Sequence, residues 1–144
     1  GNEECMKKNE SIEKIINRDL ETVHTGMAIS DVRKLFVQKG IHHVPVVSGE
    51  KLVGIISASD ILGISVDGIG ADQREMDAYL DHRFSIEELM TQKLKTLPVK
   101  STIADAAELL SEGSFHAAPV VDDQGCLAGL VTSTDLIRYL RKLF

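Results

Sequence analysis

Hydrophobic positions along the chain follow the same succession of patterns twice. Residues 28–40 (AISDVRKLFVQKG) and residues 101–113 (STIADAAELLSEG) carry apolar side chains at three- and four-residue spacing, which predicts one amphipathic helix in each stretch. The apolar stripe of each helix is formed by Ile29, Val32, Leu35 and Phe36 in the first stretch, and by Ile103, Ala106, Ala107 and Leu110 in the second.

The flanking residues extend this pattern into a larger unit. Gly40 and Gly113 suit the helix ends, and Thr102 with Asp105 resembles a capping box. Two β-rich runs follow each helix, HVPVV with KLVGIIS and AAPVV with LAGLVTS, and their short polar turns favour antiparallel pairing. A last helix follows, and each unit opens with a short amphipathic turn (SIEKII or SIEELM) and a brief extended stretch (ETVHT or KTLPV).

The succession is an internal duplication. Shifting the sequence by 74 positions places Pro45 on Pro119, and one residue inserted in the next turn accounts for the later offset of 75. One copy alone would leave an apolar sheet face uncovered, so we expect an α/β tandem repeat of two units with pseudo-twofold symmetry and a shared core. The expected divisions are an N-terminal tail at 1–11, a first repeat at 12–65, a linker at 66–85 with a helical turn or two, and a second repeat at 86–144.

Composition narrows the classes of protein. No apolar run approaches the roughly 18 residues of a membrane span, so we expect no membrane insertion. The formal net charge of −6 argues against nucleic acid, because nonspecific binding needs lysine and arginine to neutralise phosphates. Two cysteines and no recognisable secretion signal favour a cytoplasmic setting. The chain opens with Gly1 instead of methionine, which suggests a remnant of expression or a piece of a longer protein.

The repeated phrases GIISASD (54–60) and GLVTSTD (129–135) carry the candidate chemistry. A helix that begins directly after a strand exposes unpaired N–H groups, which favour anionic or hydroxyl-bearing ligands. The hydroxyls can cap the helix or donate to a phosphate oxygen, the aspartates can accept from the paired hydroxyls of a ribose, and the leading glycines leave room for a ligand or another backbone. The alternative is an ordinary helix cap and a glycine that fits a crowded strand. The candidate residues are Ser57, Ser59 and Asp60 in the first phrase, and Thr132, Thr134 and Asp135 in the second.

A β-α-β-β-α unit in tandem, with an HxxPVV strand and a GhhSxSD or GhhTxTD phrase entering a helix, resembles the CBS-domain pair, also called the Bateman module. The resemblance covers roughly residues 12–140. It implies a regulatory module without catalytic activity. Such pairs bind adenosine compounds (AMP, ADP, ATP, S-adenosylmethionine, sometimes a dinucleotide) in clefts between the repeats and commonly form homodimers. The ligand then alters an attached domain or a partner protein, which the sequence does not identify.

The resemblance also implies further ligand-binding residues. In the family, basic residues just before the proline of the HxxPVV strand commonly face the phosphates, and AMP or ATP is the expected ligand. Because adjacent strand residues point in opposite directions, we expect at least one of the first copy's two histidines to miss the ligand. The residues carried over are His42, His43 and Pro45 in the first copy, and His116 and Pro119 in the second.

Apolar side chains of one copy are expected to hold the adenine over the aspartate of the other. We expect Leu97 and Val99 to support the cleft of Asp60. In the same way, we expect Val23 and Thr25 to support the cleft of Asp135.

Other chemistries find little support. The chain has no C-x-x-C, H-E-x-x-H, P-loop or GxGxxG spacing, so we expect no metal site and no nucleotide hydrolysis. The serines of the first phrase lack a GxSxG context, so we expect no enzyme. The alternative to nucleotide binding is a dimerisation or partner-docking module with vestigial clefts, for which the C-terminal LIRYLRKLF offers apolar surface.

Overall fold

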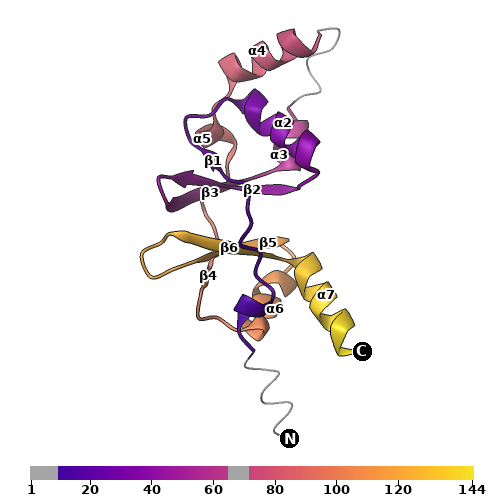
Figure 1. Ribbon diagram of the computed structural model, residues 1–144. Coiled ribbons are helices and arrows are strands. Elements are labelled where there is room, and N and C mark those ends of the chain that lie inside the picture. The colour runs from indigo at the N-terminus through magenta and orange to yellow at the C-terminus, as the bar shows by residue number, and fades with distance from the viewer. Residues whose placement is uncertain (1–9, 65–71) are drawn as a thin grey trace, which may run out of the picture. The chain divides into compact units, whose positions relative to one another are not determined.

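The computed structural model describes residues 10–64 and 72–144, and the chain divides into two compact units. Residues 21–93 form one, here called the first-repeat unit. Residues 94–144 form the other together with the chain up to Leu20, here called the second-repeat unit. Each unit has one three-stranded sheet, with its main helices on one side of that sheet (Figure 1). This is the expected α/β fold, repeated.

In the first-repeat unit the sheet has the order β1-β2-β3. Strand β1 pairs in parallel with β2, and β2 pairs antiparallel with β3. Helices α2 and α3 lie on one side of this sheet, and α4 lies outside α2 (Figure 1). The elements are β1 (Val23–His24), α2 (Ile29–Lys39), β2 (His43–Ser48), β3 (Lys51–Ser57), α3 (Ala58–Leu62), α4 (Gln73–Arg83) and α5 (Ile86–Leu89).

The second-repeat unit has the same topology, with the order β4-β5-β6. Strand β4 pairs in parallel with β5, and β5 pairs antiparallel with β6. The elements are η1 (Ile12–Lys14), β4 (Leu97–Pro98), α6 (Ile103–Ser111), β5 (Ala117–Val121), β6 (Leu127–Thr132) and α7 (Ser133–Leu143).

The strand pairs and helix ends follow the prediction. Both antiparallel pairings are confirmed, and their register shifts after Val46 in one and after Val120 in the other. Gly40 ends α2 with a φ of 62°, a left-handed conformation that glycine adopts without steric cost. The capping box at the start of α6 is also confirmed. One core assignment is wrong: Ala107 is exposed, and Leu109 packs against the core instead.

The leading segments of the two repeats have exchanged places. Ile12, from the start of the first repeat, is fully buried in the core of the second-repeat unit, and Asn17 bridges to Leu130 of β6. Correspondingly, Ile86 is buried in the core of the first-repeat unit, and Thr91 bridges to Ile55 of β3. Each compact unit therefore combines the body of one repeat with the leading segment of the other.

Helix α4 lies in the segment expected to be a linker. Where a helical turn or two was expected, the structure has an eleven-residue helix. Asp72 caps it by accepting from the Glu75 N–H, and Leu80 is fully buried against the core of the first-repeat unit. Only one residue of α4 is buried, so its sequence carries almost no amphipathic signal.

Aliphatic side chains fill both cores, and none of the helices in the described part of the chain has the length and apolar character that a membrane crossing requires. In the first-repeat unit the fully buried residues include Val23, Val32, Val44, Val46 and Ile56. In the second-repeat unit they include Ile12, Ala106, Ala118, Val120 and Val131.

Candidate functional site

The repeated phrase forms the end of a strand and the first turn of a helix in both units. In the first-repeat unit the Ser57 Oγ accepts from the Asp60 N–H (3.2 Å), and the Asp60 Oδ2 accepts from the Ser57 N–H (3.0 Å). In the second-repeat unit Thr132 and Asp135 make the same two bonds, at 3.1 and 2.8 Å. Both phrases are therefore capping boxes, as the structural alternative anticipated.

Capping leaves part of each carboxylate unused. The boxes engage Oδ2 of Asp60 and of Asp135, while Oδ1 of each has no hydrogen-bond partner among the described residues. Both aspartates are half-buried and keep access to solvent. An ionised carboxylate oxygen offers two lone-pair directions, so each free Oδ1 can still accept hydroxyl groups from a ligand.

The second hydroxyl of each phrase does not cap its helix. Ser59 is exposed, and its Oγ lies 2.9 Å from the Ser57 Oγ. Thr134 is exposed at the equivalent place in α7. These hydroxyls stand on the first turn beside the aspartates, where they can donate to a ligand oxygen.

The leading glycines of the phrases make room for the exchanged segments. A Cβ atom on Gly129 would collide with the side chain of Ile16 and lie 2.8 Å from the Asn17 carbonyl oxygen. A Cβ atom on Gly54 would lie 2.5 Å from the Met90 Sδ and 2.9 Å from its Cγ. Within each unit the glycine therefore fits a crowded strand, and the chain itself occupies the space left by the missing side chain.

The histidines before the HxxPVV strands lie beside the same helix starts. The His42 carbonyl accepts from the Ala58 N–H (2.8 Å), and the His116 carbonyl accepts from the Ser133 N–H (2.9 Å). Both histidine side chains are exposed. His43 is half-buried at the start of β2, where it pairs with Ser57. Each unit thus brings together one exposed imidazole, one capping hydroxyl and one aspartate.

The remaining predicted residues belong to the sheets and their cores. Val23 and Leu97 are buried in the cores of their own units, and Thr25 and Val99 are half-buried. Pro45 and Pro119 are buried within β2 and β5. The expected support of each aspartate by the other copy's first strand joins residues of different units and stays a prediction.

A cavity in the first-repeat unit was not anticipated from the sequence. It has a volume of about 240 Å³ and lies between the C-terminal half of α2 and the start of α3. The sequence carries one indication of this cavity. Val37 is a hydrophobic residue on the otherwise polar face of α2, and its side chain is 67% exposed. The walls are mostly apolar and are formed by Arg33, Phe36, Val37, Gly40, Ile41, His42, Ala58 and Ile61.

The described part of the chain has no cluster of side chains suited to binding a metal ion. No three or more histidine, cysteine, aspartate or glutamate side chains converge there in a group that could hold an ion. Each phrase supplies carboxylate, hydroxyl and imidazole groups that suit hydrogen bonding to a polar organic ligand.

Comparisons with known proteins place this geometry in a family. The CBS domain model matches residues 12–67 and 86–142. Inosine-5'-monophosphate dehydrogenase of Thermoplasma acidophilum is 29% identical over 134 residues, which cover 93% of this chain and 24% of that enzyme. This chain therefore spans only about a quarter of the length of that relative.

Solved structures show the same fold. The CBS domain pair of protein MJ0100, in complex with methylthioadenosine and S-adenosyl-L-methionine, has a TM-score of 0.74 at 27% identity, covering 93% of this chain and 98% of that one. CBSX2 in complex with AMP has a TM-score of 0.76 at 24% identity, with the same coverage. The family model covers both copies of the repeat, and the chain belongs to the CBS domain family.

Proposed function

We propose that this chain is a regulatory module that binds an adenine nucleotide, AMP or ATP, in clefts between its two CBS repeats. The observation that carries the proposal is the doubled constellation of an exposed histidine, a hydroxyl and a half-buried aspartate with an unused Oδ1. Support also comes from the MJ0100 domain pair, which has been solved with two adenosine compounds. The module would act in the cytoplasm on an attached domain or a partner protein.

The proposed roles follow from the chemistry of each group. Asp60 and Asp135 accept the paired hydroxyls of the ribose through Oδ1, because Oδ2 is engaged in the cap. His42 and His116 contact the phosphates, since an imidazole N–H can donate a hydrogen bond to a phosphate oxygen. The hydroxyl of Thr134 donates to the same anion at the start of α7.

Regulation requires that the ligand bind two states of the module with different affinity. A nucleotide that contacts both repeats would favour the arrangement in which both sets of contacts form. The effect on a partner is then limited to the difference in binding free energy between the states, typically about 1–3 kcal/mol.

Calorimetry of the purified protein with AMP, ADP, ATP, S-adenosylmethionine and NAD tests the proposal. We expect saturable binding of at least one compound, weakened about tenfold or more by Asp60→Asn or Asp135→Asn at the site affected. Asparagine keeps one oxygen for the helix cap and replaces the other with a donor, so folding should be preserved. If the double variant Asp60→Ala and Asp135→Ala binds nucleotide as tightly as the parent, the site assignment is wrong.

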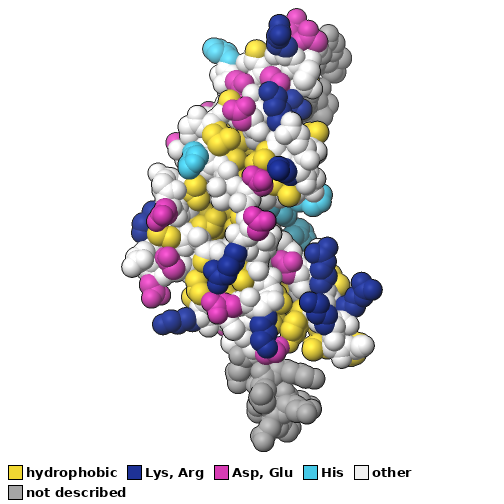
Figure 2. Space-filling model, viewed as in Figure 1, with side chains coloured by type: hydrophobic (Ala, Val, Ile, Leu, Met, Phe, Trp, Pro, Cys, Tyr) yellow, Lys and Arg dark blue, Asp and Glu magenta, His cyan; other side chains and the backbone are white. Residues whose placement is uncertain are grey.

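A second candidate function is dimerisation or partner docking, and α7 favours it. Ile137 and Leu140, three residues apart on α7, are 64% and 52% exposed, and Phe144, directly after the end of the helix, is 99% exposed. Figure 2 shows basic and hydrophobic side chains side by side over this helix. Exposed apolar patches of this kind mark contact surfaces. A stable dimer that Leu140→Ser dissociates, with no thermal shift from any adenosine compound, would favour docking over nucleotide sensing.

A further inference from the structure

Helix α2 begins without a side-chain cap of its own. Its N-cap residue, Ala28, has an extended conformation and no side chain that can accept a hydrogen bond. In the duplicated sequence Ala28 corresponds to Thr102, whose hydroxyl and Asp105 complete the capping box of α6. The first copy keeps the acidic half of that box as Asp31. The first N–H groups of α2 therefore need an acceptor from elsewhere.

Asp81 of α4 supplies that acceptor. Its Oδ1 accepts from the Ser30 N–H (2.8 Å), and its Oδ2 accepts from the Ser30 hydroxyl (2.7 Å). Ser30 is the second residue of α2 and is 6% exposed. A backbone N–H at this helical position is the group that an N-cap side chain normally satisfies. Leu80, the neighbour of Asp81, is fully buried and anchors this end of α4.

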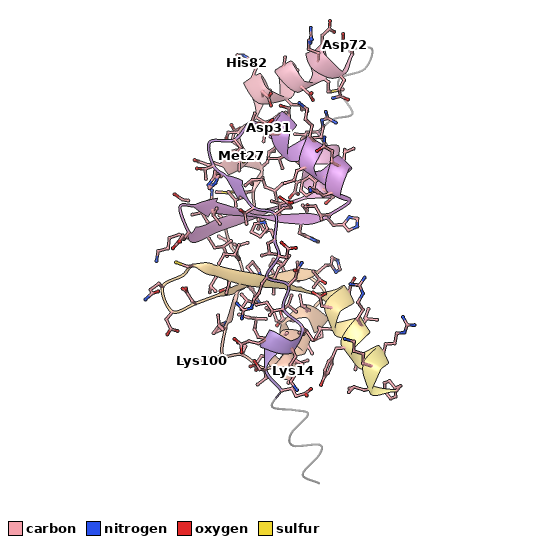
Figure 3. All side chains as sticks on the ribbon, viewed as in Figure 1. Lys14, Met27, Asp31, Asp72, His82 and Lys100 are labelled. Carbon is pink, nitrogen blue, oxygen red and sulfur yellow. The ribbon has the colours of Figure 1, made fainter. Side chains whose placement is uncertain are left out.

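A second contact between α2 and α4 lies about one helical turn from the first, and the two contacts together fix the relative register of the helices. The Asp77 Oδ1 accepts from the Arg33 Nη2 (2.8 Å) and Nε (3.2 Å). The two side chains are 15% and 16% exposed, so this ion pair is largely shielded from water. Figure 3 shows the end of α4 that carries His82 above the start of α2, which Asp31 marks.

We propose that Asp81 is a positioning residue: from the segment that connects the two repeats, it caps α2 and thereby holds the turn that leads to His42. Helix α2 ends at Lys39, and Gly40 turns the chain into Ile41 and His42. A short helix moves as a rigid rod. Fixing the start and the middle of α2 therefore also fixes the position of its C-terminal end and of the turn that follows. The coupling to His42 rests on the proposed nucleotide binding, whereas the cap itself does not.

A rescue experiment drawn from the chain's own second copy tests the cap. Asp81→Ala should lower the thermal unfolding midpoint by about 4 °C, as loss of one N-cap does in a domain of this size. Ala28→Thr recreates the threonine-to-aspartate spacing of α6, so the double variant Ala28→Thr/Asp81→Ala should recover most of that loss. Glu75→Ala removes an exposed carboxylate from the same helix and is the matched control, with a shift of about 1 °C or less.

Hydrogen exchange measured by mass spectrometry on peptides spanning residues 28–36 gives a local readout. Exchange at the start of α2 should accelerate in Asp81→Ala and slow again in the double variant. If Ala28→Thr fails to restore either the midpoint or the exchange, and Ala28→Ser fails as well, Asp81 does not act as the cap and the proposal is overturned.

Calorimetry with AMP separates the cap from its coupling to the ligand. Asp81→Ala should weaken AMP binding by about fivefold, and Ala28→Thr should restore it. An unchanged AMP affinity in a variant with a lowered midpoint refutes the coupling and leaves the cap standing. If the parent protein binds neither AMP nor any other adenosine compound, the proposed function fails, while the midpoint and the exchange rates still decide the role of Asp81.

Discussion

A methyl group added at either glycine of the repeated phrases should destabilise the protein, but to different extents. At Gly129 the new Cβ would lie 2.8 Å from the Asn17 carbonyl oxygen and collide with the Ile16 side chain. That carbonyl is held in place, because it accepts from the Leu130 N–H (3.0 Å) while the Asn17 N–H donates back to the Leu130 carbonyl (2.9 Å). At Gly54 the colliding atoms belong to the Met90 side chain, which is flexible.

The magnitudes follow from these neighbours. Overpacking costs about 1–3 kcal/mol, and weakening the two backbone hydrogen bonds of Asn17 adds about 1 kcal/mol each. Replacing glycine with alanine restricts the unfolded chain and returns about 0.5–1 kcal/mol. Gly129→Ala should therefore reduce the free energy of unfolding by about 3 kcal/mol, and Gly54→Ala by about 1 kcal/mol or less, because the Met90 thioether can rotate away.

Urea unfolding followed by far-UV circular dichroism measures both variants against the parent. In thermal scans the expected losses correspond to about 10 °C for Gly129→Ala and about 3 °C for Gly54→Ala. An equal loss of stability in the two variants, or a larger loss in Gly54→Ala, would show that the fixed backbone of Asn17 does not determine the cost of a Cβ atom at residue 129.

Three further predictions follow. Asp77→Ala leaves the Arg33 guanidinium without its carboxylate in a site where only 15% of the Arg33 side chain is exposed, so stability should fall by about 2 kcal/mol. Replacing Arg33 with methionine in the same background should recover part of that loss in denaturant titrations. Tyr139→Phe should be neutral or stabilising by about 1 kcal/mol in the same titrations, because the Tyr139 hydroxyl is buried without a partner among the described residues. Ile12→Ala should cost about 3 kcal/mol although residue 12 lies near the chain's beginning, since its side chain is fully buried, and a cost typical of an exposed position would contradict the exchanged packing.

The sequence determined most of the repeated unit because its signals are local. Valine-rich runs joined by short polar turns can pair in only one simple way, and the antiparallel pairs formed as predicted. The exchange of the leading segments could not be predicted in the same way. SIEKII and SIEELM present the same pattern, and Ile12 and Ile86 are both fully buried, so neither segment carries a preference for one unit that can be read from hydrophobicity.

The candidate site was predictable in its residues and less so in their roles. The sequence left open whether Asp60 and Asp135 cap a helix or face a ligand, because both roles need the same residue at the same position. The structure assigns one oxygen of each carboxylate to the cap. The sequence predicted only a helical turn or two where α4 lies, and the attachment of α4 was missed because it depends on Asp77 and Asp81: ion pairs and caps between distant segments leave no periodic pattern.

Because the leading segments are exchanged, the first-repeat unit and the second-repeat unit depend differently on the ends of the chain. The first-repeat unit is one continuous stretch, residues 21–93. The second-repeat unit is complete only when the segment up to Leu20 packs against residues 94–144. Removing the segment that carries Ile12, or the segment from residue 94 onward, therefore damages the same unit. A fragment of residues 86–144 would retain the strands of the second-repeat unit but lose Ile12, which is buried in its core. Residues 21–93 can be regarded as an insertion within the second-repeat unit, and this stretch is the natural fragment to express alone.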